Sequence, residues 1–150
     1  MERAISRFNM FEFDNRIALG VSGGKDSLNL LGILAGIEER FPRAELIAVS
    51  IDEGVGGYRD EALRLAREAC RGLGVEHRIL SFRALFGLTM DEIVERKVEG
   101  LSACSYCGVL RRRALNQAAR DVEADRLATA HNLDDMAQTV LLNLMRGDLR

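Results

Sequence analysis

A buried strand, a glycine-rich turn and a helix follow one another directly near the start of the chain, and this order restricts the possible folds. Residues 16–21 are mostly apolar and predict a short buried strand, while residues 26–38 carry apolar side chains three and four positions apart, as one face of a helix requires. The alternation continues with strands predicted over 44–51, 75–82 and 126–130 and helices over 58–73, 107–122 and from 133 onward. This order predicts an α/β fold, a doubly wound, Rossmann-like parallel sheet with helices on both faces.

Three local features add detail to this prediction. Thr89 and Glu92 have the spacing of a capping box and predict the start of a helix that runs to about Val98. Residues 100–106 lie between two helical patterns and predict a loop. The last helix is amphipathic, and its apolar face is expected to point inward through Ala137, Val140, Leu141 and Leu144.

The size and composition are those of one globular domain over residues 1–150. The chain is 47% hydrophobic and 29% charged, which is ordinary for such a domain, and its net charge of −2 does not favour a nucleic-acid surface. Its apolar stretches are far shorter than the roughly 18 residues of a membrane span. The first residues lack the apolar core of a signal peptide. We therefore expect a cytoplasmic protein without a membrane partner.

The turn after the first strand reads Ser22-Gly23-Gly24-Lys25-Asp26-Ser27 and has the features of a phosphate site. A helix N-terminus offers free backbone N–H groups and the positive end of the helix dipole. The two glycines let a phosphate approach the backbone, Lys25 adds a positive charge, and the two serines add hydroxyl groups. Gly20, at the end of the strand, is expected to belong to the same site.

The carboxylate of Asp26 distinguishes this turn from other phosphate loops. A Walker loop would need glycine at position 19 and serine or threonine at position 26, where this chain has Leu19 and Asp26. A carboxylate beside phosphates is repulsive unless a cation bridges them, so we assign Asp26 to hold Mg²⁺. The alternative is an ordinary glycine-rich turn in which Asp26 only supplies charge to the helix N-terminus.

Two cysteines form the pair Cys104-Ser-Tyr-Cys107, which is followed closely by Arg111, Arg112 and Arg113. Three cysteines without a secretion signal argue against a disulfide framework and favour redox, metal or sulfur chemistry at the pair. A position near a helix N-terminus predicts a lowered thiol pKa. Cys70 lies within a predicted helix beside its apolar face and is expected to be a buried small hydrophobic residue.

Polar residues also follow the second and fourth predicted strands. Ligands of open parallel sheets lie outside the carboxyl ends of the strands, so the backbone at Ile51, with Asp52 nearby, is expected to face an adenosine. After the fourth strand come Ala130, His131 and the acids Asp134 and Asp135, which suit Mg²⁺. Helix capping by Asn132 and Asp135 is the alternative explanation for this segment.

These motifs together resemble the N-type ATP pyrophosphatases, which adenylate an oxygen of a substrate and release pyrophosphate. Ser22-Gly-Gly-Lys-Asp-Ser27 is similar to their pyrophosphate loop, and Cys104-Ser-Tyr-Cys107-Gly-Val-Leu-Arg111 is similar to the TtuA/Ncs type of tRNA 2-thiouridine synthetase. The resemblance covers about residues 16–148 in four motifs that occur in the family's order. It implies an adenine nucleotide alpha hydrolase-like fold.

The resemblance also implies the roles of individual residues. Catalytic roles fall on Asp26, Cys104, Cys107, Arg111 and Asp135. ATP binding falls on Gly20, Ser22, Gly23, Gly24, Lys25, Asp26, Ser27, Ile51, Asp52 and Ala130. Mg²⁺ is assigned to Asp26 and Asp134, and a [4Fe–4S] cluster to Cys104 and Cys107.

The chain departs from this family in several ways, one of which is Ala130 in place of the family's glycine. Arg111 stands where some relatives have lysine, and no third cysteine follows Cys107 to complete a cluster. The zinc ribbons of the family are also absent, so we expect a PP-loop ATPase catalytic domain that is truncated at its C-terminus. Either a cluster ligand lies in a missing part, or the pair acts as a thiol or persulfide relay.

The predicted reaction is adenylation of O2 of a tRNA uridine followed by replacement of that oxygen with sulfur. The implied partners are tRNA and a sulfur donor, either a ubiquitin-like carrier or sulfide; a homodimer is left open. Two alternatives remain: another adenylating enzyme that thiolates cytidine or forms an amide, and an ATP-binding fragment without catalysis.

Overall fold

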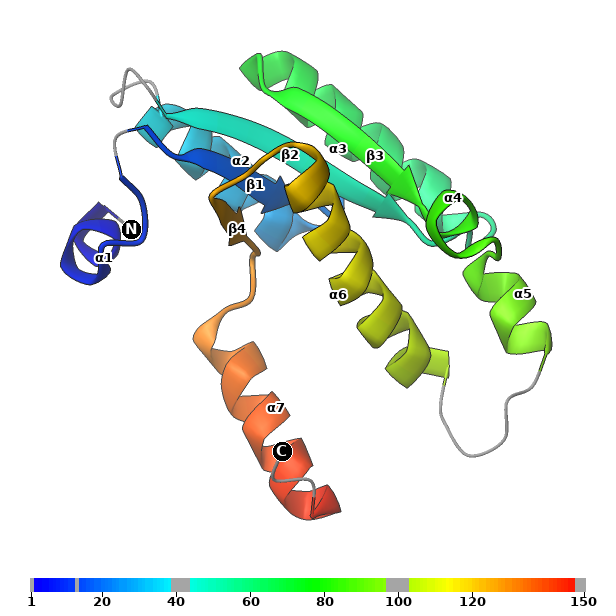
Figure 1. The fold of residues 1–150 in the computed structure, drawn as a ribbon. Helices are drawn as coiled ribbons and strands as arrows, with labels where there is room; N and C mark the ends of the chain where they lie inside the picture. Colours follow the sequence, from blue (N-terminus) through cyan, green and yellow to red (C-terminus); the bar gives the residue numbers. More distant parts are fainter. Residues whose placement is uncertain (1, 13, 39–43, 97–102, 148–150) are drawn as a thin grey trace.

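The computed structural model describes residues 2–12, 14–38, 44–96 and 103–147, and within these residues four parallel strands form one sheet (Figure 1). The elements, in chain order, are α1 (Glu2–Phe8), β1 (Arg16–Gly20), α2 (Lys25–Glu38), β2 (Glu45–Asp52), α3 (Tyr58–Leu73), β3 (Glu76–Ser81), α4 (Phe82–Phe86), α5 (Met90–Glu95), α6 (Ala103–Asp121), β4 (Arg126–Ala128) and α7 (Leu133–Arg146).

The sheet has the strand order β3-β2-β1-β4. Ile17 lies opposite Leu46 of β2 on one side and opposite Arg126 of β4 on the other. The chain therefore builds outward from β1 to β3 and then crosses back to the other side of β1. The carboxyl ends of the strands at such a change of direction form a crevice where ligands bind in open α/β sheets.

Helices cover both faces of the sheet, as expected for a doubly wound fold (Figure 1). On one face, Leu19 of β1 and Ala48 of β2 pack with Leu31 of α2 and with α3. On the other face, Ala18 and Val49 pack with α6 and with α4. Successive residues of a strand point to opposite faces, so a continuous apolar run such as residues 17–21 supplies both cores. The predicted fold class is confirmed.

The capping box of α5 and the exact span of α3 were predictable from local sequence. Thr89 Oγ1 accepts from the Glu92 backbone N–H at 3.3 Å, and a Glu92 carboxylate oxygen accepts from the Thr89 N–H at 2.8 Å. The helix ends at Glu95, and Val98 lies outside the described residues. Gly74 takes a left-handed conformation with φ +68° and closes α3.

The prediction of a loop over residues 100–106 is wrong for its described part. Helix α6 begins at Ala103, so Cys104 lies within its first turn. Residues 103–107 contain no glycine or proline that would interrupt a helix, and Gly108 is tolerated inside it. Two short helices, α1 and α4, were not predicted, and β4 ends at Ala128, two residues earlier than expected.

The predicted inward face of the last helix is also wrong. Helix α7 has no buried residue and stands away from the sheet (Figure 1). Val140, Leu141 and Leu144 are each more than half exposed. An amphipathic pattern predicts a helix and its apolar face, but it does not provide a surface for that face to pack against. Among the described residues no helix has the length and hydropathy to cross a bilayer.

His77 links β3 to the strand end that precedes the glycine-rich turn. Its Nε2 atom lies 2.8 Å from Ser50 Oγ, and that hydroxyl donates to the Val21 carbonyl at 2.6 Å. A serine has a single proton to donate, so His77 Nε2 must carry the proton in the first contact. Burial, aided by the positive charge of Arg67, lowers the pKa of His77 below its ordinary 6.5.

This lowered pKa predicts a loss of stability in mild acid. The unfolded chain binds the His77 proton more readily than the folded chain, so the free energy of unfolding should fall as pH drops below about 6.5 and level off below the folded pKa. Denaturant titrations between pH 8 and pH 5 would measure it. His77→Gln should remove this part of the pH dependence, and His131→Gln, at the exposed second histidine, should retain it. Equal profiles for wild type and His77→Gln would contradict the prediction.

Candidate functional site

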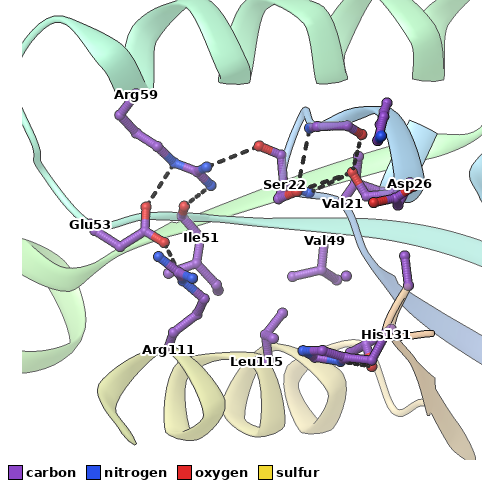
Figure 2. A pocket seen from close by; sticks show the side chains of 16 residues that line it. Val21, Ser22, Asp26, Val49, Ile51, Glu53, Arg59, Arg111, Leu115 and His131 are labelled. Carbon is purple, nitrogen blue, oxygen red and sulfur yellow. Dashed lines mark hydrogen bonds and ion pairs between the residues drawn. The ribbon is translucent and has the colours of Figure 1, made fainter. Parts of the chain in front are cut away.

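A cavity of about 380 Å³ opens at the carboxyl ends of β1, β2 and β4. One wall is the turn over residues 22–27, the opposite wall is α6, and the floor is formed by the last residues of β1 and β2 (Figure 2). A side chain at Gly20 would enter this space, because its Cβ would lie 3.3 Å from Leu115 Cδ2. The cavity therefore occupies the crevice that the strand order predicts.

The turn over residues 22–27 is held by its own serines. Ser27 Oγ donates to the Gly24 carbonyl at 2.8 Å and accepts from the Ser22 backbone N–H at 3.2 Å. The two hydroxyl oxygens, Ser22 Oγ and Ser27 Oγ, are 3.1 Å apart. Ser27 is buried while Ser22 is exposed, and both line the cavity. Ser27 thus shapes the turn from inside.

Gly23 allows the turn to pack against α3. Its φ is +86°, and a Cβ added there would lie 2.2 Å from the Ala62 carbonyl oxygen. The sequence predicted that both glycines of the turn face phosphate, but Gly23 is buried and only Gly24 lines the cavity. Backbone packing is one reason for glycine at position 23, and its predicted role in ATP binding stays a prediction.

We expect Gly23→Ala to lower the free energy of unfolding by about 1–3 kcal/mol through backbone strain alone, with the overlap at Ala62 adding to the loss. Gly24→Ala is the matched control, because its Cβ would meet Ser22 Oγ at an ordinary 3.5 Å. Its effect should stay below about 1 kcal/mol. Urea denaturation of both variants measures the difference, and equal losses would contradict the packing role of Gly23.

Lys25 and Asp26 open α2 and line the cavity with exposed side chains. The first N–H groups of a helix have no partner within the helix, so the start of α2 presents backbone donors here. A cationic side chain, helix N–H groups and a carboxylate therefore surround one end of the cavity. Mg²⁺ is usually held by one or two carboxylates together with substrate phosphates, and Asp26 fits that role.

A buried ion-pair network lies beside the turn (Figure 2). The Glu53 side chain is 3% exposed, forms an ion pair with Arg59 and accepts a hydrogen bond from Arg111. One carboxylate oxygen lies 2.8 Å from Arg59 Nε, and the other accepts from Arg111 Nε at 2.6 Å. Arg59 also donates to the carbonyls of Ser22, at 3.0 Å, and Ile51. The network therefore joins the turn, the end of β2 and α6.

The cysteine pair lies on the first two turns of α6, next to this network. Cys104 is exposed, and Cys107 is half-buried against the core below α6. Arg111, which lines the cavity, donates to Cys107 Sγ at 3.3 Å. The two thiols are three residues apart and therefore share one helix face. The Arg111 side chain thus connects Cys107 of the cysteine pair to the cavity.

The predicted lowering of the thiol pKa is wrong for Cys107. Burial raises the pKa of this thiol, and the attraction of Arg111 opposes the rise without reversing it. Cys107 lies one turn inside α6, where it packs against apolar side chains, and the charges of Glu53 and Cys104 add to the rise that burial causes. Burial also raises the pKa of Cys70, which is 1% exposed in the core under α2 and α3, as the sequence predicted for a structural cysteine.

The segment after β4 contributes only partly to the cavity. Ala130 and His131 line it, together with Thr129, whose hydroxyl lies 2.8 Å from His131 Nδ1. Asp134 and Asp135 belong to the first turn of α7 and are not among the lining residues. Asp135 forms a capping box with Asn132: its Oδ2 atom accepts from the Asn132 N–H at 2.9 Å. Their roles in Mg²⁺ binding and catalysis stay predictions.

Of the two residues predicted to face the adenosine, Ile51 and Asp52, only Ile51 lines the cavity. Ile51 lines the cavity, but its carbonyl accepts from Arg59. Asp52 lies outside the cavity lining, and its carboxylate accepts from the Gly54 N–H at 2.9 Å in the turn after β2. Val49, Ile51 and Leu115 instead form an apolar part of the cavity. A flat aromatic base suits such a surface better than it suits a charged turn.

The positions of the three cysteines decide which thiols could bind an iron–sulfur cluster together. Cys104 and Cys107 share a helix face and fit as two cluster ligands, whereas Cys70 is buried on the opposite face of the sheet. Among the described residues, no group of three or more His, Cys, Asp or Glu side chains could hold a metal ion. The described chain therefore offers two ligands of a three-thiolate cluster.

Sequence reasoning missed Glu53, Arg59, Thr129 and the apolar lining residues Val49 and Leu115. Glu53 and Arg59 lie in the segment Asp52-Glu-Gly-Val-Gly-Gly-Tyr-Arg59, which resembles a motif of the family but from which only Asp52 was assigned to the site. A glutamate directly after a buried strand, six residues before an arginine in a helix start, was an available signal. Their pairing with each other and with Arg111 depends on tertiary structure.

Comparison with known proteins agrees with this geometry. The family model for the PP-loop domain matches residues 1–149. The tRNA 2-thiolation protein NcsA of Haloferax volcanii is 46% identical over 132 residues, which is 88% of this chain and 41% of that protein. The cytoplasmic tRNA 2-thiolation protein 1 of Debaryomyces hansenii is 43% identical over 150 residues, 99% of this chain and 39% of that protein. The chain thus spans about two fifths of the length of these relatives.

Solved structures give the same result. The U34-tRNA thiolase NcsA from Methanococcus maripaludis, with its [4Fe–4S] cluster, has a TM-score of 0.85 and 38% identity over 94% of this chain and 46% of its own. The NH₃-dependent NAD synthetase of Campylobacter jejuni has a TM-score of 0.56 at 14% identity, over 98% of this chain and 72% of its own, and shows the fold alone. With a nucleotide-sized cavity at the glycine-rich turn and a family model that matches nearly all of its length, the chain belongs to the PP-loop domain family.

Proposed function

We propose that this chain is the ATP-binding catalytic core of a tRNA-thiolating enzyme. In the reaction, O2 of a tRNA uridine is adenylated, pyrophosphate is released, and sulfur replaces the activated oxygen. The observation that carries the proposal is the position of Arg111, which lines the nucleotide-sized cavity and donates to Cys107 Sγ at 3.3 Å. An adenylation site and a thiol pair are thus neighbours. The relatives are named as tRNA thiolation proteins, which supports the same proposal.

ATP would lie across the ends of the strands. Its phosphates would contact the N–H groups at the start of α2, with Lys25 beside them and Mg²⁺ held by Asp26. Its adenine would occupy the apolar part of the cavity between Val49 and Leu115. The α-phosphorus would then face α6, from which Arg111 extends.

The first chemical step breaks the bond between the α- and β-phosphates. O2 of the uridine attacks the α-phosphorus, and pyrophosphate leaves with the electron pair of that bond. Negative charge develops on the phosphoryl oxygens and on pyrophosphate, and helix N–H groups with Lys25 stabilise it. Bound Mg²⁺ would supply Lewis-acid stabilisation of the same charge.

The second step replaces oxygen by sulfur at C2. A sulfide equivalent adds to C2 of the adenylated uridine, the C2–O2 bond breaks, and AMP leaves with the oxygen and the electron pair. Cys104 and Cys107 would hold the sulfur source next to the reacting carbon, as two ligands of a cluster. A cluster bound there would present sulfide to the nucleotide. A ubiquitin-like carrier or free sulfide is proposed as the donor, with the cytoplasm as the compartment.

The two thiols should be needed for sulfur transfer and not for ATP binding. In Cys104→Ala and Cys107→Ala, we expect tRNA-dependent pyrophosphate release to persist while 2-thiouridine no longer forms, because the nucleotide turn is intact in both. Pyrophosphate release and mass spectrometry of digested tRNA measure the two steps. Cys70→Ala is the control, because it removes a thiol from the opposite core.

The alternatives give different results in the same assays. Pyrophosphate release without 2-thiouridine in the wild type, unchanged in both cysteine variants, would identify an adenylating enzyme without sulfur chemistry. Binding of ATP with no tRNA-dependent pyrophosphate release by the wild type would identify an ATP-binding module. Release of ADP and phosphate would contradict α–β cleavage.

A further inference from the structure

We propose that Arg59 is a positioning residue that sets the shape of the ATP-binding turn by holding the Ser22 carbonyl, and that Glu53 holds Arg59 in place. The proposal rests on the proposed function only in taking ATP as the ligand. It assigns a role to two buried charged residues that the reaction itself does not use. Arg59 is proposed to act through the backbone of Ser22, and its side chain also borders the cavity.

The Arg59 guanidinium donates to two backbone carbonyls and forms an ion pair with Glu53 (Figure 2). Nη1 donates to the Ser22 carbonyl at 3.0 Å, Nη2 donates to the Ile51 carbonyl, and Nε lies 2.8 Å from Glu53. The side chain of Arg59 is 9% exposed and that of Glu53 is 3% exposed. Such a residue is placed to orient the backbone at the border of the cavity.

The contact with Ser22 fixes the peptide that enters the turn. A trans peptide is planar, so orienting the Ser22 carbonyl also orients the Gly23 N–H. The same arginine holds the Ile51 carbonyl at the end of β2. Arg59 therefore ties the turn, which is one wall of the cavity, to the end of β2 in the floor. Gly23 packs on Ala62 of the same helix, so α3 supports the turn at two points.

Arginine is required here because the fork has to reach two carbonyls and a carboxylate at once. A lysine can keep the ion pair with Glu53, but its single nitrogen cannot also replace the two donors that hold the carbonyls. Glu53 makes the network larger, because its second oxygen accepts from Arg111 at 2.6 Å. The carboxylate thus connects the support of the turn with the side chain that contacts Cys107.

A purely structural ion pair is the alternative to this role, and it predicts a different pattern. Loss of a structural pair loosens the whole domain and weakens every ligand alike. Loss of a positioning residue for the turn weakens ligands according to the phosphates that they place on the turn. ATP carries the β- and γ-phosphates and AMP lacks them, so comparison of these two nucleotides separates the two roles.

The experiment measures binding of ATP and AMP to the full chain by isothermal titration calorimetry in Arg59→Lys. We expect the Kd of ATP to rise about tenfold, which corresponds to the loss of one hydrogen bond from a charged donor, and the Kd of AMP to change by less than about threefold. Arg64→Lys is the matched control, because Arg64 lies on the same helix and pairs with Glu61 and Glu68 at the exposed surface. It should leave both constants unchanged.

Two further measurements cover a variant that does not fold. Glu53→Gln keeps an acceptor for Arg59 but removes the charge. It should also raise the Kd of ATP more than the Kd of AMP. In the wild type, the guanidinium N–H signals of Arg59 should exchange slowly with solvent and shift when inorganic pyrophosphate is added. Unshifted Arg59 signals in the presence of bound pyrophosphate would overturn the proposal without any variant.

The outcomes separate this inference from the proposed function. Equal weakening of ATP and AMP, or unchanged binding of ATP in Arg59→Lys, would overturn the positioning role even if tRNA-dependent pyrophosphate release continues. Selective weakening of ATP would support it even if the wild type released no pyrophosphate with tRNA. A wild-type chain that binds no ATP would overturn both.

Discussion

Asp26→Asn should reduce tRNA-dependent pyrophosphate release by at least about 100-fold, the loss expected when a group that stabilises transition-state charge is removed. Asp26 is exposed at the wall of the cavity beside Lys25, and asparagine has nearly the same shape without the charge that Mg²⁺ needs. The change therefore isolates metal binding from packing. A coupled pyrophosphate assay at saturating Mg²⁺ and ATP measures it.

The competing explanation is that Asp26 only stabilises the N-terminus of α2. Asp60 provides the control, because it is an exposed acid in the first turn of α3. Both asparagine variants should lose a similar 0.3–1 kcal/mol, roughly, of stability from the helix dipole. Only Asp26→Asn should lose activity. Normal pyrophosphate release by Asp26→Asn would remove Asp26 from the mechanism.

Glu53→Ala should have the largest effect on stability, a loss of about 3–5 kcal/mol in the free energy of unfolding. The change leaves the buried Arg59 guanidinium without its anion and also frees Arg111. Guanidinium chloride denaturation, monitored by circular dichroism, measures the loss. Glu61→Ala is the matched control: Glu61 pairs with Arg64 at the surface, and its removal should cost less than about 1 kcal/mol.

A combined variant tests whether the network serves stability or function. Glu53→Leu with Arg59→Met replaces the buried pair by apolar side chains of similar size, and such replacements are often neutral for stability. We expect the double variant to recover much of the stability that Glu53→Ala loses, without recovering ATP binding. A stable double variant that binds ATP normally would show that the pair is dispensable for the turn.

The parts of the fold that could be predicted from the sequence are those with local causes. Helix α3 begins and ends where its apolar spacing and Gly74 predict, and Thr89 with Glu92 starts α5 as a capping box. The glycine-rich turn lies at the predicted end of β1, because the strand, the turn and the helix adjoin in the sequence. Helix α7 begins at the predicted residue for the same reason.

The parts that could not be predicted depend on neighbours distant in the sequence. The inward face of α7 needs a packing surface that its own residues do not specify, and the raised pKa of Cys107 depends on how deeply α6 packs. Glu53 and Arg111 are 58 residues apart, and no local pattern announces their contact. The candidate residues at the strand ends were therefore predictable as a group. Which of them line the cavity, which cap a helix and which hold the turn in place was not predictable.

The most direct measurement follows one oxygen atom. A tRNA anticodon stem-loop with ¹⁸O at O2 of the target uridine is incubated with the chain, ATP, Mg²⁺ and a sulfide donor, and the AMP formed is analysed by mass spectrometry. If O2 attacks the α-phosphorus and leaves with it, AMP must carry one ¹⁸O atom for each 2-thiouridine made. Unlabelled AMP, or thiolated RNA formed together with ADP, would contradict the account.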